Sequence, residues 1–525
     1  MRRRLLLTFT LRSTALALVV VIAISFAALI GLFEFLEVKA IDAAFALRGP
    51  LPPTAPIVIV AIDDESFAQT QLQWPWPRAY MAQLISQIAA GKPKVITTDI
   101  FWYEPGNDPG GDEALAKAIA EAGNVILAND INRVEQAGFV LDQFRRPIPA
   151  LEDSALHTGL ANLYRDPADG FIRQMPVYLI NEPDGRAYFS WAALTTLTYL
   201  GASIPESIRP SSVQFGGITV PLTEGRLIVN YRGKPGSAFT QIQAYQVASG
   251  EVYQQRGPDF FRDKIVLIGA TSVVLQDVYS TPFEGSRLPM PGVEVNAHVI
   301  DTLLSQQFIY RWPVILGAVV TLFIGLLAYV FSGIPVPFLS LTLAFGSGLG
   351  YLGLWAFAFN TLRIEMYVVA PLVSLTLGYA VPSVERAISE QVEKRRVRGI
   401  FERFVSPEMV EQMIDRGLEA VRGQRAELTI MFSDIRGFTT LSEQMSPDDV
   451  VAILNEYLGV MSDVIHRHGG TIDKYEGDLI MAFFNAPLPQ SDHAKRALQA
   501  AIENALHSRQ TAGQVGQTGK PPHPV

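Results

Sequence analysis

Long apolar runs alternate with amphipathic segments along this chain. No charged residue occurs from Ser13 to Phe33, and none occurs from Pro313 to Leu362. The first run is long enough for one membrane-spanning helix, and the second is long enough for two. A turn near Gly333 and Pro335 is expected to separate those two helices. A further span fits Met366 to Val384, so the pattern predicts four transmembrane helices.

Basic residues flank the outermost spans. Four arginines precede the first span, and a second basic cluster follows the last one: Arg2, Arg3, Arg4 and Arg12, then Lys394, Arg395, Arg396 and Arg398. The positive-inside rule therefore predicts a multi-pass protein of the plasma (inner) membrane with both termini cytoplasmic. A cleaved signal peptide is the alternative interpretation of the first run.

The segment between the first two spans, residues 38–312, alternates short β-branched runs with helical patterns. The expected strands are Ile57–Ala61, Val95–Thr98, Val125–Ala128 and Ile265–Gly269, and the clearest expected helices are Arg78–Ala90 and Asp112–Ala122. Such alternation is typical of an α/β domain with a largely parallel sheet. The sequence thus predicts an extracytoplasmic α/β domain.

Acidic residues follow two of these strands. Asp63, Asp64 and Glu65 come after the first strand, and Asp99 comes after the second. Ligands of open α/β sheets gather at the carboxyl ends of the strands. Aspartate at such a place is also a common helix N-cap, so both interpretations stay open.

Six segments of residues 35–298 resemble a known sensor family in their order and in their placement between spans. They are Phe35–Asp42, Leu47–Pro50, Ile57–Ser66, Trp74–Arg78, Lys264–Ser272 and Pro291–His298. The family is the CHASE-type extracellular sensor, second subtype. The resemblance implies a sensory domain placed ahead of a cytoplasmic output domain, with an unknown extracytoplasmic ligand.

Composition narrows the classes of function. The 525 residues carry a formal net charge of -9, and no basic face dominates, so a nucleic-acid partner is not expected. The absence of cysteine excludes disulfides, thiolate metal sites and cysteine nucleophiles. Residues 385–423 are charged with intermittent apolar positions such as Ile388 and Val392, which suits a linker helix. That helix either pairs with its copy in a dimer or lies beside anionic membrane lipid.

The cytoplasmic end combines a strand, a helix and a hairpin. Apolar Leu428–Phe432 precedes Asp434, an amphipathic helix is expected over Pro447–His468, and Asp478 lies in the turn between Thr471–Tyr475 and Leu479–Phe484. If the strand and the hairpin share one sheet, the two carboxylates meet and can bridge two magnesium ions. Taken alone, however, an aspartate after a strand is more often a cap than a metal ligand, and a Gly-Asp pair is more often only a turn.

The segments Phe432–Thr440 and Asp473–Phe484 resemble the two leading motifs of class III adenylate and guanylate cyclases. Carried over by position, the resemblance makes Asp434 and Asp478 the metal ligands, together with the backbone carbonyl of Ile435. It places Phe438 and Thr439 against the nucleotide phosphates. The implied fold is an α+β ferredoxin-like domain, and the implied cofactors are two Mg²⁺ (or Mn²⁺).

Lys474 matches the residue that selects the base in this family, where lysine goes with adenine and glutamate with guanine. Alternatively, Lys474 is simply an exposed lysine on a strand and has no role in selecting the base. The implied enzyme is an adenylate cyclase, a phosphorus–oxygen lyase that converts ATP to cyclic AMP and pyrophosphate. Enzymes of this class work as dimers, so a homodimer is expected.

The resemblance ends near Leu506. The family's second base-selecting residue, and the Asn and Arg that stabilise its transition state, have no counterpart here. Catalytic residues beyond the metal ligands are therefore not placeable, and impaired activity is expected. Residues 508–525 contain no Phe, Tyr or Trp and are expected to be disordered.

A non-enzymatic membrane sensor or dimerisation protein is the alternative to an enzyme. A diguanylate cyclase is disfavoured, because no G-G-[DE]-E-F motif occurs. The expected organisation follows from these patterns: cytoplasmic N-terminus and first span 1–37, sensor 38–312, three spans 313–384, linker 385–423, partial cyclase domain 424–507 and tail 508–525.

Overall fold

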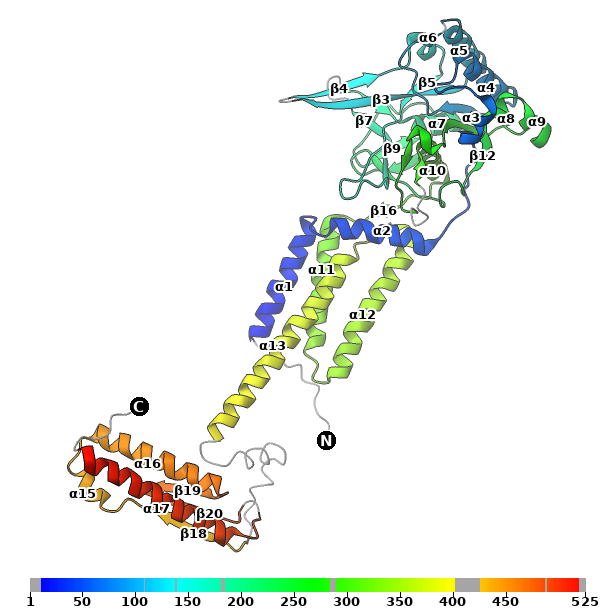
Figure 1. The fold of residues 1–525 in the computed structure, drawn as a ribbon. Coiled ribbons are helices and arrows are strands. Elements are labelled where there is room, and N and C mark those ends of the chain that lie inside the picture. The colour runs from blue at the N-terminus through cyan, green and yellow to red at the C-terminus, as the bar shows by residue number, and fades with distance from the viewer. Residues whose placement is uncertain are drawn as a thin grey trace. The chain divides into compact units, whose positions relative to one another are not determined.

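The computed structural model describes residues 11–107, 109–136, 139–180, 185–283, 289–401, 425–486 and 489–518. Two compact units divide the chain, one ending at Ser383 and the other beginning at Val384 (Figure 1). The first unit contains two hydrophobic clusters, and the second has a cluster of its own.

A seven-stranded sheet organises the predicted sensor domain. Its strands are β1 (Ile57–Ile62), β2 (Val95–Thr98), β3 (Val125–Gln136), β4 (Phe139–Arg145), β5 (His157–Leu160), β12 (Thr240–Gln243) and β13 (Ile265–Ala270). The order is β12-β1-β13-β2-β3-β4, and β5 also pairs with β3. Every pairing is parallel except that of β3 with β4. The predicted strands and the largely parallel sheet are thus confirmed.

The central strands are buried on both faces, which explains their unbroken apolar sequences. Along β1, Ile57 and Ile59 join one core cluster, and Val58 and Val60 join the other, because successive side chains point to opposite faces. Helices cover both faces: α4 (Arg78–Ala90) and α5 (Pro109–Ala122) pack on the second cluster, and α7 (Trp191–Leu200) and α10 (Gly292–Ser305) pack on the first.

Shorter elements complete this domain. The helices are α3 (Asp64–Thr70), α6 (Pro149–Glu152), α8 (Ala244–Ala248), α9 (Glu251–Arg256) and the 3₁₀ turn η1 (Val273–Leu275). Two-stranded pairs join β6 (Gln174–Pro176) to β11 (Arg226–Ile228), β7 (Tyr178–Ile180) to β8 (Ala187–Phe189), β9 (Ser212–Phe215) to β10 (Ile218–Pro221), β14 (Val278–Tyr279) to β15 (Met290–Pro291), and β16 (Tyr310–Arg311) to β17 (Ile364–Glu365). The sequence pattern predicted none of these pairs.

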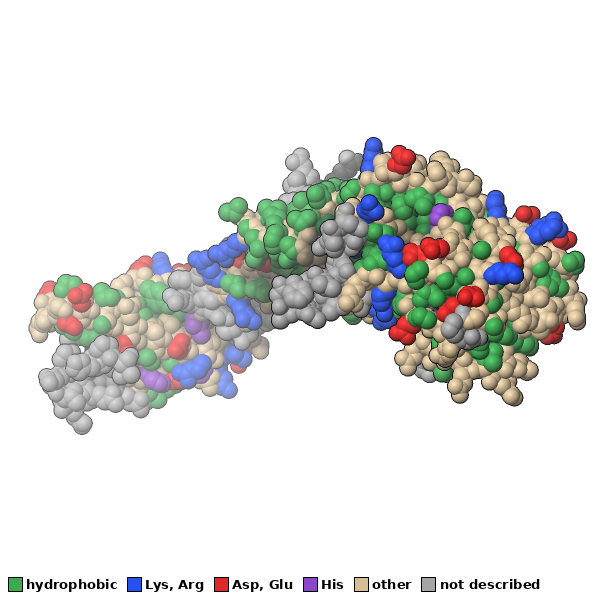
Figure 2. All heavy atoms as spheres, turned by 90° about the horizontal axis from the view of Figure 1, so that it is seen from above, with side chains coloured by type: hydrophobic (Ala, Val, Ile, Leu, Met, Phe, Trp, Pro, Cys, Tyr) green, Lys and Arg blue, Asp and Glu red, His purple; other side chains and the backbone are tan. Residues whose placement is uncertain are grey.

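Among the described residues, three helices are long and apolar enough to cross a membrane. They are α1 (Leu11–Leu29), α11 (Val314–Ser332) and α12 (Pro337–Phe357), the last continued by a π-helical turn over Ala358–Leu362. Hydrophobic side chains cover the surface of this helical region, whereas charged side chains are spread over the α/β domain (Figure 2). The predicted fourth span falls within α13 (Val369–Phe401), and its crossing of the membrane stays a prediction.

The first half of α13 packs against the three apolar helices (Figure 1). A Cβ atom on Gly378 would lie 2.7 Å from the carbonyl oxygen of Gly325 on α11, so the two backbones are in close contact. The hydroxyls of Ser340 on α12 and Tyr379 on α13 lie 3.1 Å apart. Small residues and hydroxyl pairs are common at contacts between membrane helices. This packing is what a four-helix membrane bundle requires.

A helix that the sequence did not predict follows α1. The first span was expected to reach Phe33, but α1 ends at Leu29 and α2 occupies Glu34–Arg48. Figure 1 shows α2 lying across the ends of the apolar helices. The buried carboxylate of Glu37 on α2 accepts hydrogen bonds from the backbone N–H groups that begin α13. The boundary expected at residues 37–38 therefore falls inside a helix.

The second unit contains a small antiparallel sheet. Its elements are β18 (Thr429–Ser433), α15 (Phe438–Ser442), α16 (Pro447–Arg467), β19 (Thr471–Glu476), β20 (Leu479–Phe484) and α17 (His493–Thr518). The strand order is β18-β20-β19. Residues of α16 and α17 pack with Met431, Ile480 and Ala482 on one face of the sheet. The predicted strand, helix and hairpin are all present.

Helices extend into both the predicted linker and the predicted tail. Residues 385–401 of the predicted linker continue α13 as one helix, whereas residues 402–424 lie outside the described part of the chain. The tail was expected to be disordered from Ser508, but α17 continues to Thr518. No proline occurs between Ser508 and Pro521, so the backbone there can keep donating helical hydrogen bonds. Residues 519–525 lie outside the described part.

Candidate functional site

Strand pairing brings the two motif aspartates to one edge of the small sheet. Because β20 lies between β18 and β19 and is antiparallel to both, the end of β18 meets the turn that joins the hairpin. Ser433, the last residue of β18, is opposite Ile480 of β20. Asp434 therefore follows directly where Asp478 lies in the turn.

The two carboxylates share one backbone donor. The N–H of Ile435 donates to Oδ1 of Asp434 at 3.0 Å and to Oδ2 of Asp478 at 3.2 Å. A hydrogen bond with Asp478, together with repulsion between the two charges, raises the pKa of the exposed Asp434 carboxyl. Two carboxylates that share one donor repel each other, and a proton or a cation between them relieves the repulsion. The arrangement attracts a positively charged ion.

The donor atoms present fit a hard divalent cation. Asp434 and Asp478 offer carboxylate oxygens, which Mg²⁺ and Mn²⁺ prefer. The carbonyl of Ile435 accepts the N–H of Phe438 at 3.2 Å and keeps a second lone pair for a metal. No group of three or more His, Cys, Asp or Glu side chains with metal-site spacing occurs in the described part of the chain. A Mg²⁺ ion held by few carboxylates keeps other positions for water or phosphate oxygens.

The expected phosphate contacts lie immediately beyond this pair. Gly437 has a φ of +79°, a left-handed conformation that glycine adopts without steric cost, and it turns the chain into α15. Phe438 and Thr439 are the first residues of that short helix. Both residues therefore follow Asp434 closely in the chain, and their contact with phosphate stays a prediction.

Lys474 lies on β19 with its side chain exposed. Its Nζ atom is 3.1 Å from Oε1 of Glu476, and a hydrogen bond to that carboxylate raises the pKa of Lys474. The register of the β19–β20 pair shifts between Ile472 and Lys474, opposite Ala482 and Met481. Sequence reasoning missed the Glu476 partner, although residues two apart in a strand share a face.

Tyr457 is a second contact that the sequence did not reveal. Its hydroxyl, on α16, lies 3.0 Å from Oγ of Ser433, the residue before Asp434. Burial is the main cause that raises the pKa of Tyr457, and the charges of Asp434 and Asp478 add to it. Tyr457 therefore fixes the end of β18 beside the aspartate pair. Tyr457 occupies an apolar position of an amphipathic helix, so the sequence carried no indication that it contacts Ser433.

The acidic residues of the sensor domain divide between the two interpretations left open. Asp63 caps α3, since its carboxylate accepts the N–H of Ser66 at 2.8 Å. Asp64 accepts a hydrogen bond from the hydroxyl of Ser272, and Glu65 lies in the first turn of α3. Asp99 is followed by non-helical residues 100–107 and lines a cavity. The interpretation as a helix N-cap is therefore confirmed for Asp63. It does not explain Asp99, which does not directly precede a helix and lines a cavity.

Two family models match the chain. The CHASE2 domain matches residues 15–331, and the adenylate and guanylate cyclase catalytic domain matches residues 421–518. Since the first match covers more than half of the 525 residues, the chain belongs to the CHASE2-domain family. It is a membrane-associated multi-domain protein that joins this sensor domain to a class III cyclase domain.

Curated relatives named as adenylate cyclases are similar to part of this chain. Adenylate cyclase 1 of Rhizobium meliloti is 42% identical over 103 residues, 19% of this chain and 16% of the relative. The adenylate cyclase of Anabaena cylindrica is 38% identical over 125 residues, 23% of this chain and 24% of the relative. The crystal structure of the guanylyl cyclase Cya2 is 47% identical, covering 19% of this chain and 51% of that chain with a TM-score of 0.18. The chain spans a quarter or less of the length of these two curated relatives.

Proposed function

We propose that this protein is a receptor-type adenylate cyclase that converts ATP to cyclic AMP and pyrophosphate in response to an extracytoplasmic signal. The observation that carries the proposal is the meeting of the Asp434 and Asp478 carboxylates at the N–H of Ile435. The match of the surrounding residues to the cyclase catalytic domain supports it. The adenylate cyclase relatives favour ATP as the substrate.

In this proposal, the carboxylates of Asp434 and Asp478 and the carbonyl of Ile435 hold the metal ions. Two Mg²⁺ or Mn²⁺ ions bound there would activate the ribose 3′-hydroxyl and neutralise charge on the leaving pyrophosphate. Phe438 and Thr439 position the phosphates. Lys474 donates a hydrogen bond to a ring nitrogen of adenine after it leaves Glu476.

Metal-dependent nucleotide binding by the 525-residue chain tests this site. A fluorescent ATP analogue should bind in the presence of Mn²⁺, and EDTA should abolish binding. Asp434→Asn and Asp478→Asn should each weaken binding by roughly tenfold or more, because each removes a charged ligand. Asp473→Asn is the matched control, since Asp473 is an exposed carboxylate on the same hairpin. Equal binding by all three variants would reject the metal assignment.

A homodimer is part of the proposal. Ile430 and Phe432 on β18 are 52% and 62% exposed, while Met431 between them is buried against the helices. An apolar sheet face that no helix of the described residues covers suits contact with a second copy. Charged substitutions at Ile430 and Phe432 should shift the protein towards the monomer in sedimentation experiments, and an unchanged oligomeric state would contradict this interface.

We propose further that these 525 residues alone convert little ATP. The family's Asn and Arg have no counterpart in the sequence, and the loss of such donors costs orders of magnitude in rate. A cyclic AMP assay with Mn²⁺ and ATP measures this directly. Robust turnover would show that other residues supply the transition-state contacts.

The receptor role requires four spans, with both termini cytoplasmic and the CHASE2 domain outside. Packing of α13 against the three apolar helices supports the fourth span. Reporter fusions after Arg12 and Lys394 should report cytoplasm, and a fusion near Gly216 should report the outside. A cytoplasmic signal at Gly216 would reject the receptor role.

A further inference from the structure

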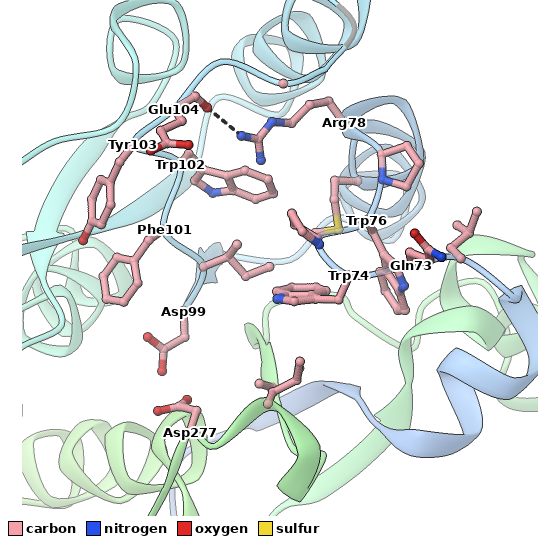
Figure 3. A pocket seen from close by; sticks show the side chains of 18 of the residues that line it. Gln73, Trp74, Trp76, Arg78, Asp99, Phe101, Trp102, Tyr103, Glu104 and Asp277 are labelled. Carbon is pink, nitrogen blue, oxygen red and sulfur yellow. Dashed lines mark hydrogen bonds between the residues drawn. The ribbon is translucent and has the colours of Figure 1, made fainter.

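A cavity of about 1160 Å³ lies at the carboxyl edge of the large sheet (Figure 3). Its lining includes residues at or just after the ends of three strands: Asp99 after β2, Ala161 after β5 and Ala270 in β13. Ligands of open parallel sheets bind outside this edge. The volume is slightly above the range of roughly 300–1,000 Å³ that is typical of sites for small organic molecules.

Two carboxylates face each other inside this cavity. Figure 3 shows the side chains of Asp99 and Asp277 pointing towards one another. Asp277 has a hydrogen bond with the hydroxyl of Tyr279, and its carboxylate lies beside Gly292 at the start of α10. The N–H of Asp99 donates to the Ile268 carbonyl, but no described residue donates to its carboxylate. Burial raises the pKa of Asp99, and the charge of Asp277 raises it further.

No cation on the described cavity wall neutralises this pair. Arg78 is the single Lys or Arg among the described lining residues. Its Nε atom lies 3.0 Å from Oδ1 of Asp112, and its Nη2 donates to the Glu104 carbonyl at 2.9 Å. The guanidinium also lies over the ring of Trp102, 4.3 Å from its centroid. The charge of Arg78 is therefore committed elsewhere, and no Lys or Arg on the described cavity wall pairs with Asp99 or Asp277.

Aromatic side chains also line this cavity. Trp74 and Phe101 keep 37% and 44% of their surface exposed, which is high for such large rings in a folded domain. Trp76 and Trp102 are 2% exposed and also line the cavity. The indole Nε1–H groups of Trp76 and Trp102 have no acceptor among the described residues. The exposed rings are a surface that the flat body of a bound molecule would cover.

We propose that this cavity binds a protonated organic amine with a flat or apolar body. The ammonium lies between Asp99 and Asp277, and the body packs on the aromatic wall. A bare metal ion fits less well, because a metal site needs more ligands than two carboxylates and does not use indole rings. An organic anion is excluded by the two facing carboxylates. The assignment deepens the receptor part of the proposed function, and a test of binding alone leaves the cyclase proposal standing if it fails.

Matched compounds that share a body and differ in charge test the assignment. The probes are phenethylamine and tryptamine, each compared with its neutral alcohol and its carboxylic acid counterpart, and MnCl₂ tests the metal alternative. Binding is measured by calorimetry and by thermal shift on the full chain in detergent. Each amine should bind at least about tenfold more tightly than its alcohol, since a hydrogen bond between an ammonium and a carboxylate is stronger than one made by a neutral hydroxyl.

Variants separate a specific site from a general effect on folding. Asp99→Asn should weaken amine binding about tenfold or more, yet raise the melting temperature of the free protein, because it removes repulsion from Asp277. Trp74→Ala should weaken binding of the amine and of the alcohol together. Asp63→Asn is the matched control, since it is also a strand-end aspartate, caps α3 and lies outside the cavity lining.

Several results would overturn the proposal. These are binding of the alcohol or the acid as tight as that of the amine, displacement of the amines by Mn²⁺, and amine binding that survives Asp99→Asn. Absence of binding by both amines at millimolar concentration would overturn it as well. A lower melting temperature for free Asp99→Asn would contradict the unneutralised carboxylate pair.

Discussion

The carboxylate of Glu37 accepts a hydrogen bond from the backbone N–H of Val368 at 2.8 Å, across 331 positions of sequence. It also accepts the N–H groups of Val369 and Ala370 at 2.9 and 3.0 Å. Glu37 thereby caps the helix that runs on to Phe401, and a negative charge is favourable at that end of the helix dipole. A side chain of α2 thus fixes the start of the helix that leads out of the membrane unit.

Glu37→Ala should lower the free energy of unfolding of the first unit by roughly 2–4 kcal/mol. The reason is that three backbone N–H groups lose a charged acceptor at a buried position. Thermal unfolding of the protein in detergent measures the loss. Glu34→Gln is the control one turn away, where the partially exposed pair with Arg311 should contribute less than about 1 kcal/mol. Equal effects of the two variants would show that the cap is not specific.

The stability of the sensor domain should fall as the pH rises from about 4.5 to about 7 because of Glu294. Burial raises the pKa of its carboxyl from 4.5 to about 7, although the N–H of Gly236 donates to it. The folded protein therefore binds a proton that the unfolded chain has lost, which costs about 1.4 kcal/mol per pH unit in this range.

Glu294→Gln should flatten this dependence when melting temperatures are recorded across the same pH range. Glutamine keeps an acceptor for the N–H of Gly236 and cannot titrate. Glu206→Gln, at an exposed carboxyl, should leave the profile as in the wild type. An identical slope in Glu294→Gln would contradict the raised pKa.

A buried ion pair between Arg232 and Asp301 should contribute strongly to the stability of the α/β domain. Arg232 and Asp301 are 1% and 0% exposed, and Asp301 also accepts the N–H groups of Thr54 and Ala55 at 2.7 and 2.8 Å. Asp301→Ala should cost roughly 3–5 kcal/mol, because it leaves a buried guanidinium unpaired. Chemical denaturation of the purified chain provides the measurement.

The exposed pair of Asp259 and Arg262 is the control for that substitution. Asp259→Ala should change stability by less than about 0.5 kcal/mol, since water solvates both groups. If the two alanine variants unfold at the same denaturant concentration, burial does not decide the strength of these pairs.

Lys474→Ala should reduce the preference for ATP over GTP by about tenfold, because a hydrogen bond to the base is lost. Competition between the two nucleotides for Mn²⁺-dependent binding gives the ratio. Glu476→Gln should act in the opposite direction, since it frees Lys474 from its 3.1 Å ion pair. Lys495→Ala, an exposed lysine on α17, should change neither preference. A ratio that Lys474→Ala leaves intact would exclude the base contact.

Local patterns predicted the regular elements with good accuracy. The helix expected over Arg78–Ala90 has those bounds in the structure, and the strand expected over Val95–Thr98 does as well. Helical periodicity and β-branched runs act over a few residues, so a single sequence carries them. The meeting of Asp434 and Asp478 was also predictable, because a strand and a following hairpin leave few ways to pair.

Contacts between distant segments were decided only by the tertiary structure. Asp63 and Asp99 both follow a strand, yet one caps α3 and the other faces Asp277 from 178 positions away. α2 carries a mixed sequence whose capping role depends on where Val368 lies. The sequence by itself determined which segments become helices, strands and apolar spans, because those choices depend on neighbouring residues. Which carboxylates became caps, ion pairs or cavity walls was decided by burial and by partners that only the folded chain brings together.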